Sequence, residues 1–590
     1  MNNIVLLLID SMNNSHIKDS SIELTPFLNT LKNKGVFCES MYSQAPYTEA
    51  ANMGIYCGTD VLDNGGYIFR YKDAPLTIFE AMKQKGYETY YNDFQPQCHL
   101  SSVRRGIDHI YYSVGYDLGA LWSYRLVHYS GLLKEDKLNE SDFDTLKEIF
   151  KDNFQGWIQF TEDILKKDKS VNMICDNDKT YDAAEVKKLV EKEFNTYLLN
   201  PTDYIIDVLK CGTSHRLFSI PAFVQNYKIK NRTVMDYVRK EYKPLLKRIR
   251  SMGRKLNSRN CKGIFKGPCK QTINFIKKPC RENLKNVAKS ALLSLNQLYD
   301  LDLFERIGEN YDLFKNSPSL KTHVDHYLDW RKNTSSSQPH FAFMHVDDIH
   351  NPEVFFTYDT EDVSILAAEK EHAIQLLDQI PPTYQGSLSH DLSLRYIDSA
   401  IEYFFKKMEL YSYLDDTTIV ICADHGFSFS GNPLRDSVIT NLFLENYNIP
   451  FIVCGPKINH KEIIGLRQSK DIPATLCDLA DGKIPLEFTG HSVFENSVYD
   501  SLLIEYCGGG CPDLSRREIK MASFNEQWFI GSLATLKEPV TKFNITEVYN
   551  LIDDPTQTKN LVKEIDYCKI QELVEKINER KKRIMQSLNV

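Results

Sequence analysis

Short apolar runs that end in polar residues are the clearest pattern in this sequence. The run NIVLLLI is followed by Asp10, FAFMHV leads through DDI to His350, and TTIVICA is followed by Asp424 and His425. These runs are short and rich in branched side chains, which is typical of strands buried in a parallel sheet. With the helix-like runs between them, they predict an α/β fold in which a mostly parallel central sheet lies between helices.

The periodicity along the chain predicts four segments. Residues 1–115 alternate strand-like and helix-like runs, as expected of βαβ units that form the first part of a core domain. Residues 116–338 are helix-rich and charged, and we expect them to form an insertion into that core. Residues 339–490 contain the second part of the core, and residues 491–590 form a small C-terminal subdomain that ends in the amphipathic run IQELVEKINERKKRIM.

The polar residues after these strands are candidates for a shared metal site. In open α/β sheets ligands gather at the carboxyl ends of the strands, so side chains far apart in the sequence meet there. Asp10, Asp424 and His425 offer carboxylate oxygens and an imidazole nitrogen, which bind divalent metals. Thr48, in SQAPYTEAANMGIYCGT, offers a hydroxyl that would be the natural nucleophile. Taken alone, Asp10 could equally cap a helix, and Thr48 could be an ordinary loop hydroxyl.

The composition is that of an ordinary globular protein. The chain has 590 residues, 42% hydrophobic and 25% charged, with a formal net charge of −8, and its length allows two or three domains. No run approaches the roughly 18 apolar residues that cross a bilayer, and no Lys or Arg precedes the first apolar run as in a signal peptide. We therefore expect a cytoplasmic protein, with peripheral attachment to the inner membrane face as an option.

The cysteines support a reducing compartment. The 14 cysteines are scattered without the spacing of a disulfide framework. Cys422 and Cys454 lie inside apolar runs, where a thiol behaves as a small hydrophobic group. Cys507 and Cys511 flank three glycines, which we interpret as a turn. A metal-binding or redox pair is the alternative, but no second pair follows at zinc-ligand spacing.

A basic segment stands out in the predicted insertion. Residues 228–289 contain 20 Lys or Arg and only three acidic residues, with apolar residues such as Tyr242, Leu245 and Ile249 interleaved. Such a segment would suit an anionic membrane surface or a charged glycan, with nucleic acid the less favoured polyanion. The alternative is a solvated helical face that pairs with acidic surfaces elsewhere in the protein.

Four ordered motifs resemble the sulfatase branch of the alkaline phosphatase superfamily. They are TPFLNTLKNKGVFCESMYSQAPYT, RYIDSAIEYFFKKMELYSYLDDTTIVICADHG, KDIPATLCDLADG and EVYNLIDDPTQTKNLVKE. The resemblance covers roughly the first 110 residues and most of the chain after about residue 338. It implies that Asp10, Thr48, Asp424 and His425 hold one divalent metal. Mn²⁺ or Zn²⁺ suits carboxylates with an imidazole, and Mg²⁺ or Ca²⁺ is the alternative.

The resemblance also implies roles for other polar residues. His350, in a His-x-Pro element, would face the transferred group or protonate the leaving oxygen, and His491 falls where relatives place a basic residue near that group. Surface loop histidine is the alternative for His491. Asp348 would be a partner of the ligands or bind a second metal, and Asp471 in KDIPATL would be structural.

Three departures from the family motif bear on the reaction. Sulfatases carry Cys or Ser, in Cys/Ser-x-Pro-x-Arg, at the position of Thr48, and that residue is converted to formylglycine. Here Glu49, Ala50, Ala51 and Asn52 follow, so no formylglycine can form. The family's Gly-Lys-Trp-His segment is replaced around Asn92 and Asp93, and Ser11 stands where many relatives have a second acidic residue.

A threonine at this position resembles the phosphodiesterases, phosphoethanolamine transferases and lipoteichoic acid synthases of the superfamily. The leading hypothesis is a phosphodiesterase or phosphotransferase that forms a phosphothreonine at Thr48. Its substrate would be a phosphodiester or head-group donor, with phosphoglycerol or phosphoethanolamine moved onto a glycan. The alternatives are a sulfate-ester hydrolase with an unmodified threonine, and a non-catalytic binding protein on the same fold.

Overall fold

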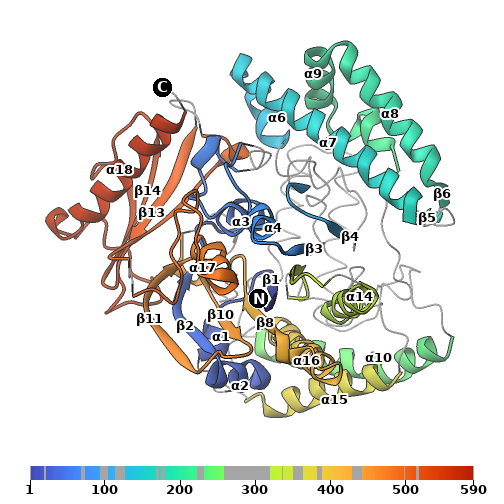
Figure 1. Ribbon diagram of the computed structural model, residues 1–590. Helices are drawn as coiled ribbons and strands as arrows, with labels where there is room; N and C mark the ends of the chain where they lie inside the picture. The colour runs from blue at the N-terminus through green and yellow to red at the C-terminus, as the bar shows by residue number, and fades with distance from the viewer. Residues whose placement is uncertain are drawn as a thin grey trace.

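A mixed central sheet with helices on both faces forms the core of the computed structural model (Figure 1). The structure describes residues 2–18, 22–67, 73–93, 104–112, 126–167, 172–174, 180–221, 232–257, 319–334, 337–349, 363–381, 388–427, 442–496, 499–512 and 517–588. His350 and most of the basic segment beyond residue 257 lie outside these described residues.

Within the described residues, nine strands form the central sheet in the order β11-β2-β10-β8-β1-β7-β3-β4, with β9 paired to β2. Their bounds are β1 (Asn3–Ile9), β2 (Val36–Tyr42), β3 (Glu88–Asp93), β4 (His109–Tyr112), β7 (His340–Val346), β8 (Thr417–Cys422), β9 (Asn448–Ile449), β10 (Phe451–Cys454) and β11 (Lys461–Gln468). The predicted mostly parallel α/β sheet is confirmed. The short strands β9 and β10 run antiparallel to their neighbours.

Strand β1 lies at the centre of the sheet, parallel to β7 on one side and β8 on the other. All but its first residue are fully buried, because helices cover both faces of the sheet. One face carries α2 (Pro26–Lys34), α14 (Leu320–Asn333) and α16 (Leu388–Leu410), and the other carries α3 (Thr48–Cys57), α4 (Ile78–Gln84) and α17 (Asp471–Asp481). Burial on both faces explains why the strand sequences are continuous apolar runs.

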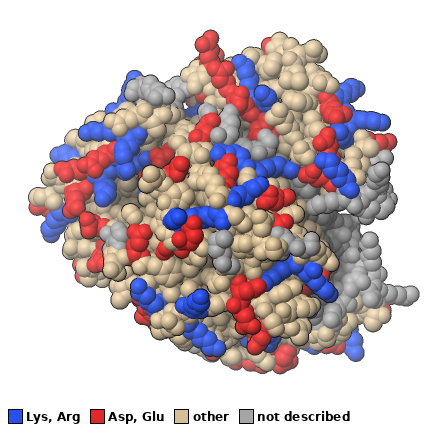
Figure 2. Space-filling model, viewed as in Figure 1, with Lys and Arg blue, Asp and Glu red and all other residues tan. Residues whose placement is uncertain are grey.

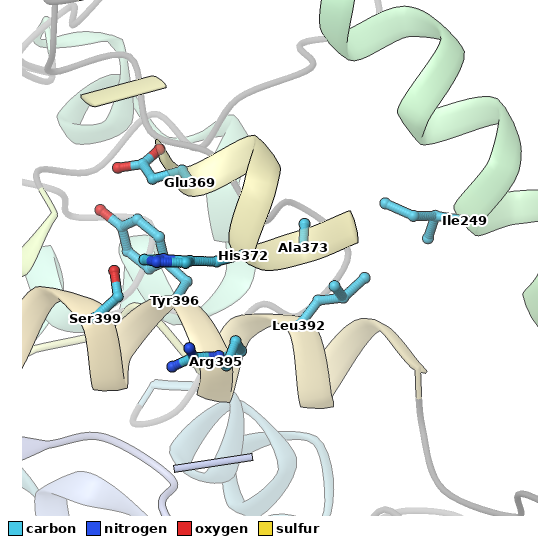
Figure 3. Close-up of a pocket in the computed structure, with 8 residues that line it drawn as sticks. All are labelled: Ile249, Glu369, His372, Ala373, Leu392, Arg395, Tyr396 and Ser399. Carbon is cyan, nitrogen blue, oxygen red and sulfur yellow. The ribbon is translucent and has the colours of Figure 1, made fainter. Parts of the chain in front are cut away.

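Two further helices form an outer layer over α16. Helix α10 (Arg232–Asn257) packs on α15 (Val363–Gln379), and both contact α16. Figure 3 shows Ile249 of α10 facing Ala373 of α15 and Leu392 of α16 around a small cavity. Tyr242 and Leu245 of α10 are buried as well, and the Tyr242 hydroxyl donates to the carbonyl of Leu366. The apolar side chains of this part of the basic segment therefore face the protein.

The remaining elements lie around the edges of the core. A helical group comprises α6 (Val127–Lys134), α7 (Glu140–Lys167), α8 (Ala183–Leu199) and α9 (Pro201–Cys211), with the hairpin β5 (Asn172–Ile174) and β6 (Thr180–Asp182). The C-terminal part forms an antiparallel sheet of β12 (Leu502–Cys507), β13 (Glu518–Phe524), β14 (Trp528–Thr535) and β15 (Ile545–Asn550), with α18 (Gln571–Ser587) packed on it. The short helix α1 (Ser15–Lys18) follows β1.

On the face shown in Figure 2, the Lys and Arg side chains of the described residues lie interspersed with Asp and Glu. None of the helices in the described residues combines the length and the apolar character needed to cross a bilayer.

A buried ion cluster attaches α18 to the core. Arg580, which is 2% exposed, donates from Nε and Nη2 to both carboxylate oxygens of Glu505, at 2.8 and 2.6 Å, and from Nη1 to Asp63 at 2.6 Å. Glu505 also accepts from the amide of Leu62. A two-pronged pair of this kind fixes geometry, and removal of one partner leaves the other charged and buried.

We expect Arg580→Ala to lower the free energy of unfolding by about 3–5 kcal/mol, because Glu505 would stay buried without its cation. Lys582→Ala, an exposed position two residues along the same helix, is the matched control and should change stability by less than about 0.5 kcal/mol. Urea denaturation of the three proteins measures this. Equal stability of Arg580→Ala and Lys582→Ala would contradict the proposed attachment.

Candidate active site

The central three strands deliver polar side chains to one point at their carboxyl ends. Asp10 follows β1, His345 is the next-to-last residue of β7, and Asp424 follows β8. Leu8 of β1 is level with His345 on one side and with Cys422 on the other, so the residues just beyond them lie at similar depth. All three polar side chains are fully buried.

Three side chains are close enough to hold one metal ion. Ligand atoms of Asp10, His345 and Asp424 all lie within 4.8 Å of one another. The separation of His345 Nε2 from Asp424 Oδ2 is 3.9 Å. Carboxylate oxygens with an imidazole nitrogen are a donor set that divalent transition metals prefer, so the residues fit such an ion.

Thr48 and His425 lie beside this cluster. Thr48 is the first residue of α3, and its Oγ1 is 3.4 Å from Asp10 Oδ2 and 3.4 Å from His425 Nε2. His425 Nε2 is in turn 3.6 Å from Asp10 Oδ1 and 3.4 Å from Asp424 Oδ2. The four residues that the sequence predicted as metal ligands are therefore brought together, and their role as ligands stays a prediction.

The position of His425 determines which ring nitrogen faces the cluster. Its Nδ1 is 2.7 Å from the carbonyl oxygen of Gly426, an acceptor, so Nδ1 carries the proton. In the neutral imidazole Nε2 then has a lone pair, and this nitrogen faces Thr48 and the two carboxylates. Gly426 is required here because a Cβ would lie 2.4 Å from Asn13 Oδ1.

Ser11 holds both carboxylates in place. Its amide donates to Asp424 Oδ1 at 3.2 Å, and its hydroxyl donates to Asp10 Oδ1 at 2.6 Å. The backbone of Ser11 is left-handed, with φ of 66°, a conformation that costs a non-glycine residue about 1–3 kcal/mol. The His425 amide donates to the same Asp424 oxygen at 2.8 Å. A serine in place of the relatives' second acid therefore adds hydrogen bonds instead of charge.

Charges around the cluster shift the pKa values of its members. Burial raises the pKa of Asp424, and the negative charge of Asp10 raises it further. For His345, burial alone would lower the pKa, but the nearby carboxylates, first of all Asp93, outweigh burial and raise its pKa to about 9. The centre thus concentrates negative charge and favours a cation.

His345 lies within reach of the site residues in the sequence, but the sequence pattern assigns neither it nor Asp93 a role in the centre. His345 Nδ1 is 3.2 Å from Asp93 Oδ1, and Asp93 ends β3. One feature of the sequence points to His345, because it is the single polar residue in the apolar run FAFMHV. The pairing of β3 with β7, which brings Asp93 next to it, has no counterpart in the sequence pattern.

The other predicted site residues have different positions. The ring of His491 is half-exposed, packs on Tyr499 and lies 3.7 Å from Glu495, and none of these described contacts belongs to the cluster. Asp348 accepts from the amide of Leu320 and so fixes the start of α14. A catalytic role for His491 stays a prediction, and the same holds for His350, which lies outside the described residues.

Asp471 has the structural role that the sequence predicted. It accepts hydrogen bonds from the amides of Gln468 and His491, each at 2.9 Å, and from the hydroxyl of Tyr499 at 2.6 Å. These bonds join the end of β11 to the start of α17 and to the segment around His491.

Comparison with solved structures finds chains that are similar to this one over nearly its whole length at low identity. A Bacteroides thetaiotaomicron protein from work on glycosaminoglycan metabolism is 11% identical, with 100% of this chain and 96% of that chain covered and a TM-score of 0.49. A protein of the alkaline phosphatase superfamily from Vibrio parahaemolyticus is 11% identical, with 99% of this chain and 87% of that chain covered and a TM-score of 0.45. The phosphonate monoester hydrolase of Agrobacterium radiobacter is 11% identical, with 99% of this chain and 96% of that chain covered and a TM-score of 0.46.

Comparison with curated proteins finds no match. The sulfatase family model matches residues 2–173 and 269–482, which include Asp10, Thr48, Asp424 and His425. The resemblance inferred from the motifs is confirmed. Because the match spans more than half of the sequence, the chain belongs to the sulfatase family.

Proposed function

We propose that this protein is a metal-dependent phosphodiesterase or phosphotransferase that acts through Thr48. The observation that carries the proposal is the position of Thr48 Oγ1, within 3.4 Å of both Asp10 Oδ2 and His425 Nε2 at the start of α3. The family's formylglycine is made from Cys or Ser, so a threonine at this position leaves its own hydroxyl as the nucleophile.

Asp10, Thr48, Asp424 and His425 would hold one divalent ion. Buried carboxylates with an imidazole suit Mn²⁺ or Zn²⁺, and Mg²⁺ or Ca²⁺ is less well served by the nitrogen ligand. When bound, the ion supplies positive charge that lowers the pKa of the threonine hydroxyl and offsets the carboxylates.

The start of α3 is suited to an anionic substrate. Thr48 is the first helical residue, and Tyr47 before it provides no side-chain cap. The first amide groups of a helix have no partner within the helix, and the helix dipole adds positive potential there. A phosphoryl group at Thr48 would receive hydrogen bonds from these amides as negative charge develops on its oxygens.

The reaction that fits this arrangement has two steps. Thr48 Oγ1 releases its proton to solvent and attacks phosphorus, the bond from phosphorus to the leaving alcohol oxygen breaks, and that oxygen takes up a proton from a histidine. Asp10 Oδ2, 3.4 Å from Oγ1, orients the hydroxyl for attack. Water or an acceptor hydroxyl then attacks the phosphothreonine and frees Thr48. We propose His350 or His491 as the proton donor.

Phosphoglycerol and phosphoethanolamine are the transferred groups that we favour, with a glycan as acceptor. Sulfate-ester hydrolysis is the second candidate, and membership of the sulfatase family is the observation that favours it. The two candidates differ in the atom that Thr48 would attack, so paired substrates separate them.

We expect Thr48→Ala to abolish hydrolysis of bis(4-nitrophenyl) phosphate, a loss of about a thousandfold or more, because the nucleophile is removed. Thr48→Ser should keep part of the activity, since the hydroxyl remains. Mass spectrometry of rapidly quenched wild-type protein should find a phosphoryl adduct on the Thr48 peptide. Comparable diester hydrolysis by Thr48→Ala would refute Thr48 as nucleophile. Faster turnover of 4-nitrophenyl sulfate than of bis(4-nitrophenyl) phosphate or of 4-nitrophenyl phosphate, the monoester, would favour the second candidate.

Asp424→Asn should lower bound Mn²⁺ or Zn²⁺ after reconstitution at least about tenfold, because a buried charged ligand is lost. Asp391→Asn is the matched control, since Asp391 is also a buried carboxylate but lies on α16 outside the cluster. Elemental analysis of dialysed protein gives the metal content, and circular dichroism checks the fold. Full metal content in folded Asp424→Asn would disprove its role as ligand.

We also propose that the basic segment 228–289 binds anionic membranes or glycans electrostatically, and that the protein is cytoplasmic and peripheral to the inner membrane face. In its described part, Lys240 is exposed while Tyr242, Leu245 and Ile249 face the protein. Arg248 and Glu241 already pair with Asp378 and Lys370 of α15. Charge instead of apolar insertion would therefore provide the attraction.

We expect the protein to sediment with vesicles of phosphatidylglycerol at low ionic strength and to be released at about 0.5 M salt, where charges are screened within a few ångströms. Vesicles of phosphatidylcholine alone are the control. Absence of binding at low salt would exclude the membrane surface and leave a charged glycan or the solvated face as the explanation for the segment.

A further inference from the structure

Asp93 and His345 are direct neighbours in the central sheet. Strands β3 and β7 are parallel, and their register places Asp93 opposite His345. Both side chains are buried, at 2% and 0% exposure, and Asp93 Oδ1 lies 3.2 Å from His345 Nδ1. Asp93 lies in the stretch that replaces the family's Gly-Lys-Trp-His segment, and His345 comes from a distant part of the sequence.

The other nitrogen of His345 faces the metal cluster. Nε2 is 3.9 Å from Asp424 Oδ2, and a ligand atom of His345 lies within 4.8 Å of ligand atoms of both Asp10 and Asp424. The two ring nitrogens therefore have different neighbours, with a carboxylate outside the cluster on one side and the candidate ligands on the other.

Asp93 is itself held in place by two tyrosines. The Tyr91 hydroxyl donates to Asp93 Oδ2 at 2.7 Å, and the Tyr56 hydroxyl lies 3.4 Å from the same oxygen. The two hydroxyls are 2.8 Å apart. With Oδ2 used by tyrosines, Oδ1 is directed at His345, so the orientation of the imidazole is determined by a buried chain of contacts from α3 and β3.

We propose that His345 is a further ligand of this metal centre and that Asp93 is its positioning residue. A carboxylate that accepts from Nδ1–H leaves the Nε2 lone pair facing the ion and raises its basicity, as in other carboxylate–histidine–metal arrangements. The inference rests on the metal-binding part of the proposed function and is independent of Thr48 as nucleophile.

Titration calorimetry of the metal-free full-length protein with Mn²⁺ and with Zn²⁺ tests the inference. His345→Gln should weaken binding about 10–100-fold, and Asp93→Asn about tenfold, because the ligand or its orientation is lost. The visible spectrum of Co²⁺-loaded protein should change in His345→Gln, since one nitrogen donor is removed. A purely structural histidine would leave this spectrum unchanged.

His340→Gln is the matched control. His340 is a buried histidine at the other end of β7 and contacts Tyr327 instead of the cluster. If His345→Gln does not fold, Asp93→Asn and Tyr91→Phe, which keep the size of the side chain, decide the question. Wild-type metal affinity and Co²⁺ spectrum in the folded His345 or Asp93 variants would overturn the inference.

Failure of the proposed function gives a different result. Diester turnover by Thr48→Ala, combined with metal loss in His345→Gln, would remove Thr48 as nucleophile and leave this inference standing. A wild-type protein that binds none of the three metals would overturn both.

Discussion

Repulsion between buried carboxylates is the constraint on which the centre of this molecule depends. The order of the parallel strands brings Asp10 and Asp424 to one point, with Asp93 a short distance away. Charges taken out of water at such distances cost several kcal/mol each unless they are compensated. The raised pKa of Asp424, which follows from burial and then from Asp10, reflects this cost. Imidazoles, backbone amides and hydroxyls therefore surround these carboxylates and contact their oxygen atoms.

This compensation determines the local backbone. The Ser11 amide and hydroxyl reach the two carboxylates only because that residue is left-handed, and the strain is offset by two buried hydrogen bonds. On the opposite side, the turn after β8 brings Gly426 against Asn13, whose side chain bonds with both backbone groups of Phe427. Because Ser11 and Gly426 are small, the ends of β1 and β8 can approach closely enough for Asp10 and Asp424 to meet.

The sequence was sufficient for the fold and for residues at strand ends, but not for contacts across the sheet. Asp10 and Asp424 could be placed because each follows an apolar run whose direction is known in a parallel sheet. His345 lies within such a run, and its partner Asp93 depends on the register of β3 against β7, which neither strand's own pattern contains. The antiparallel direction of β10 could not be predicted either, because FIVC is apolar when it is read in either direction. The basic residues of α10 suggest an anionic surface, but the sequence pattern does not show that its apolar residues pack on α15, which lies more than a hundred residues along the chain.

The central position of β1 has a consequence for how the protein is made. This strand is synthesised before both of its sheet neighbours, β7 and β8, which lie beyond residue 339. At 5–20 residues per second, synthesis of the intervening chain takes roughly 15–65 s. During that time the apolar strand lacks both of its sheet neighbours, and an unpaired apolar strand is prone to non-native association. Asp10 and Asp424 meet only after β8 has been added, and the centre is therefore assembled late in the folding of the core.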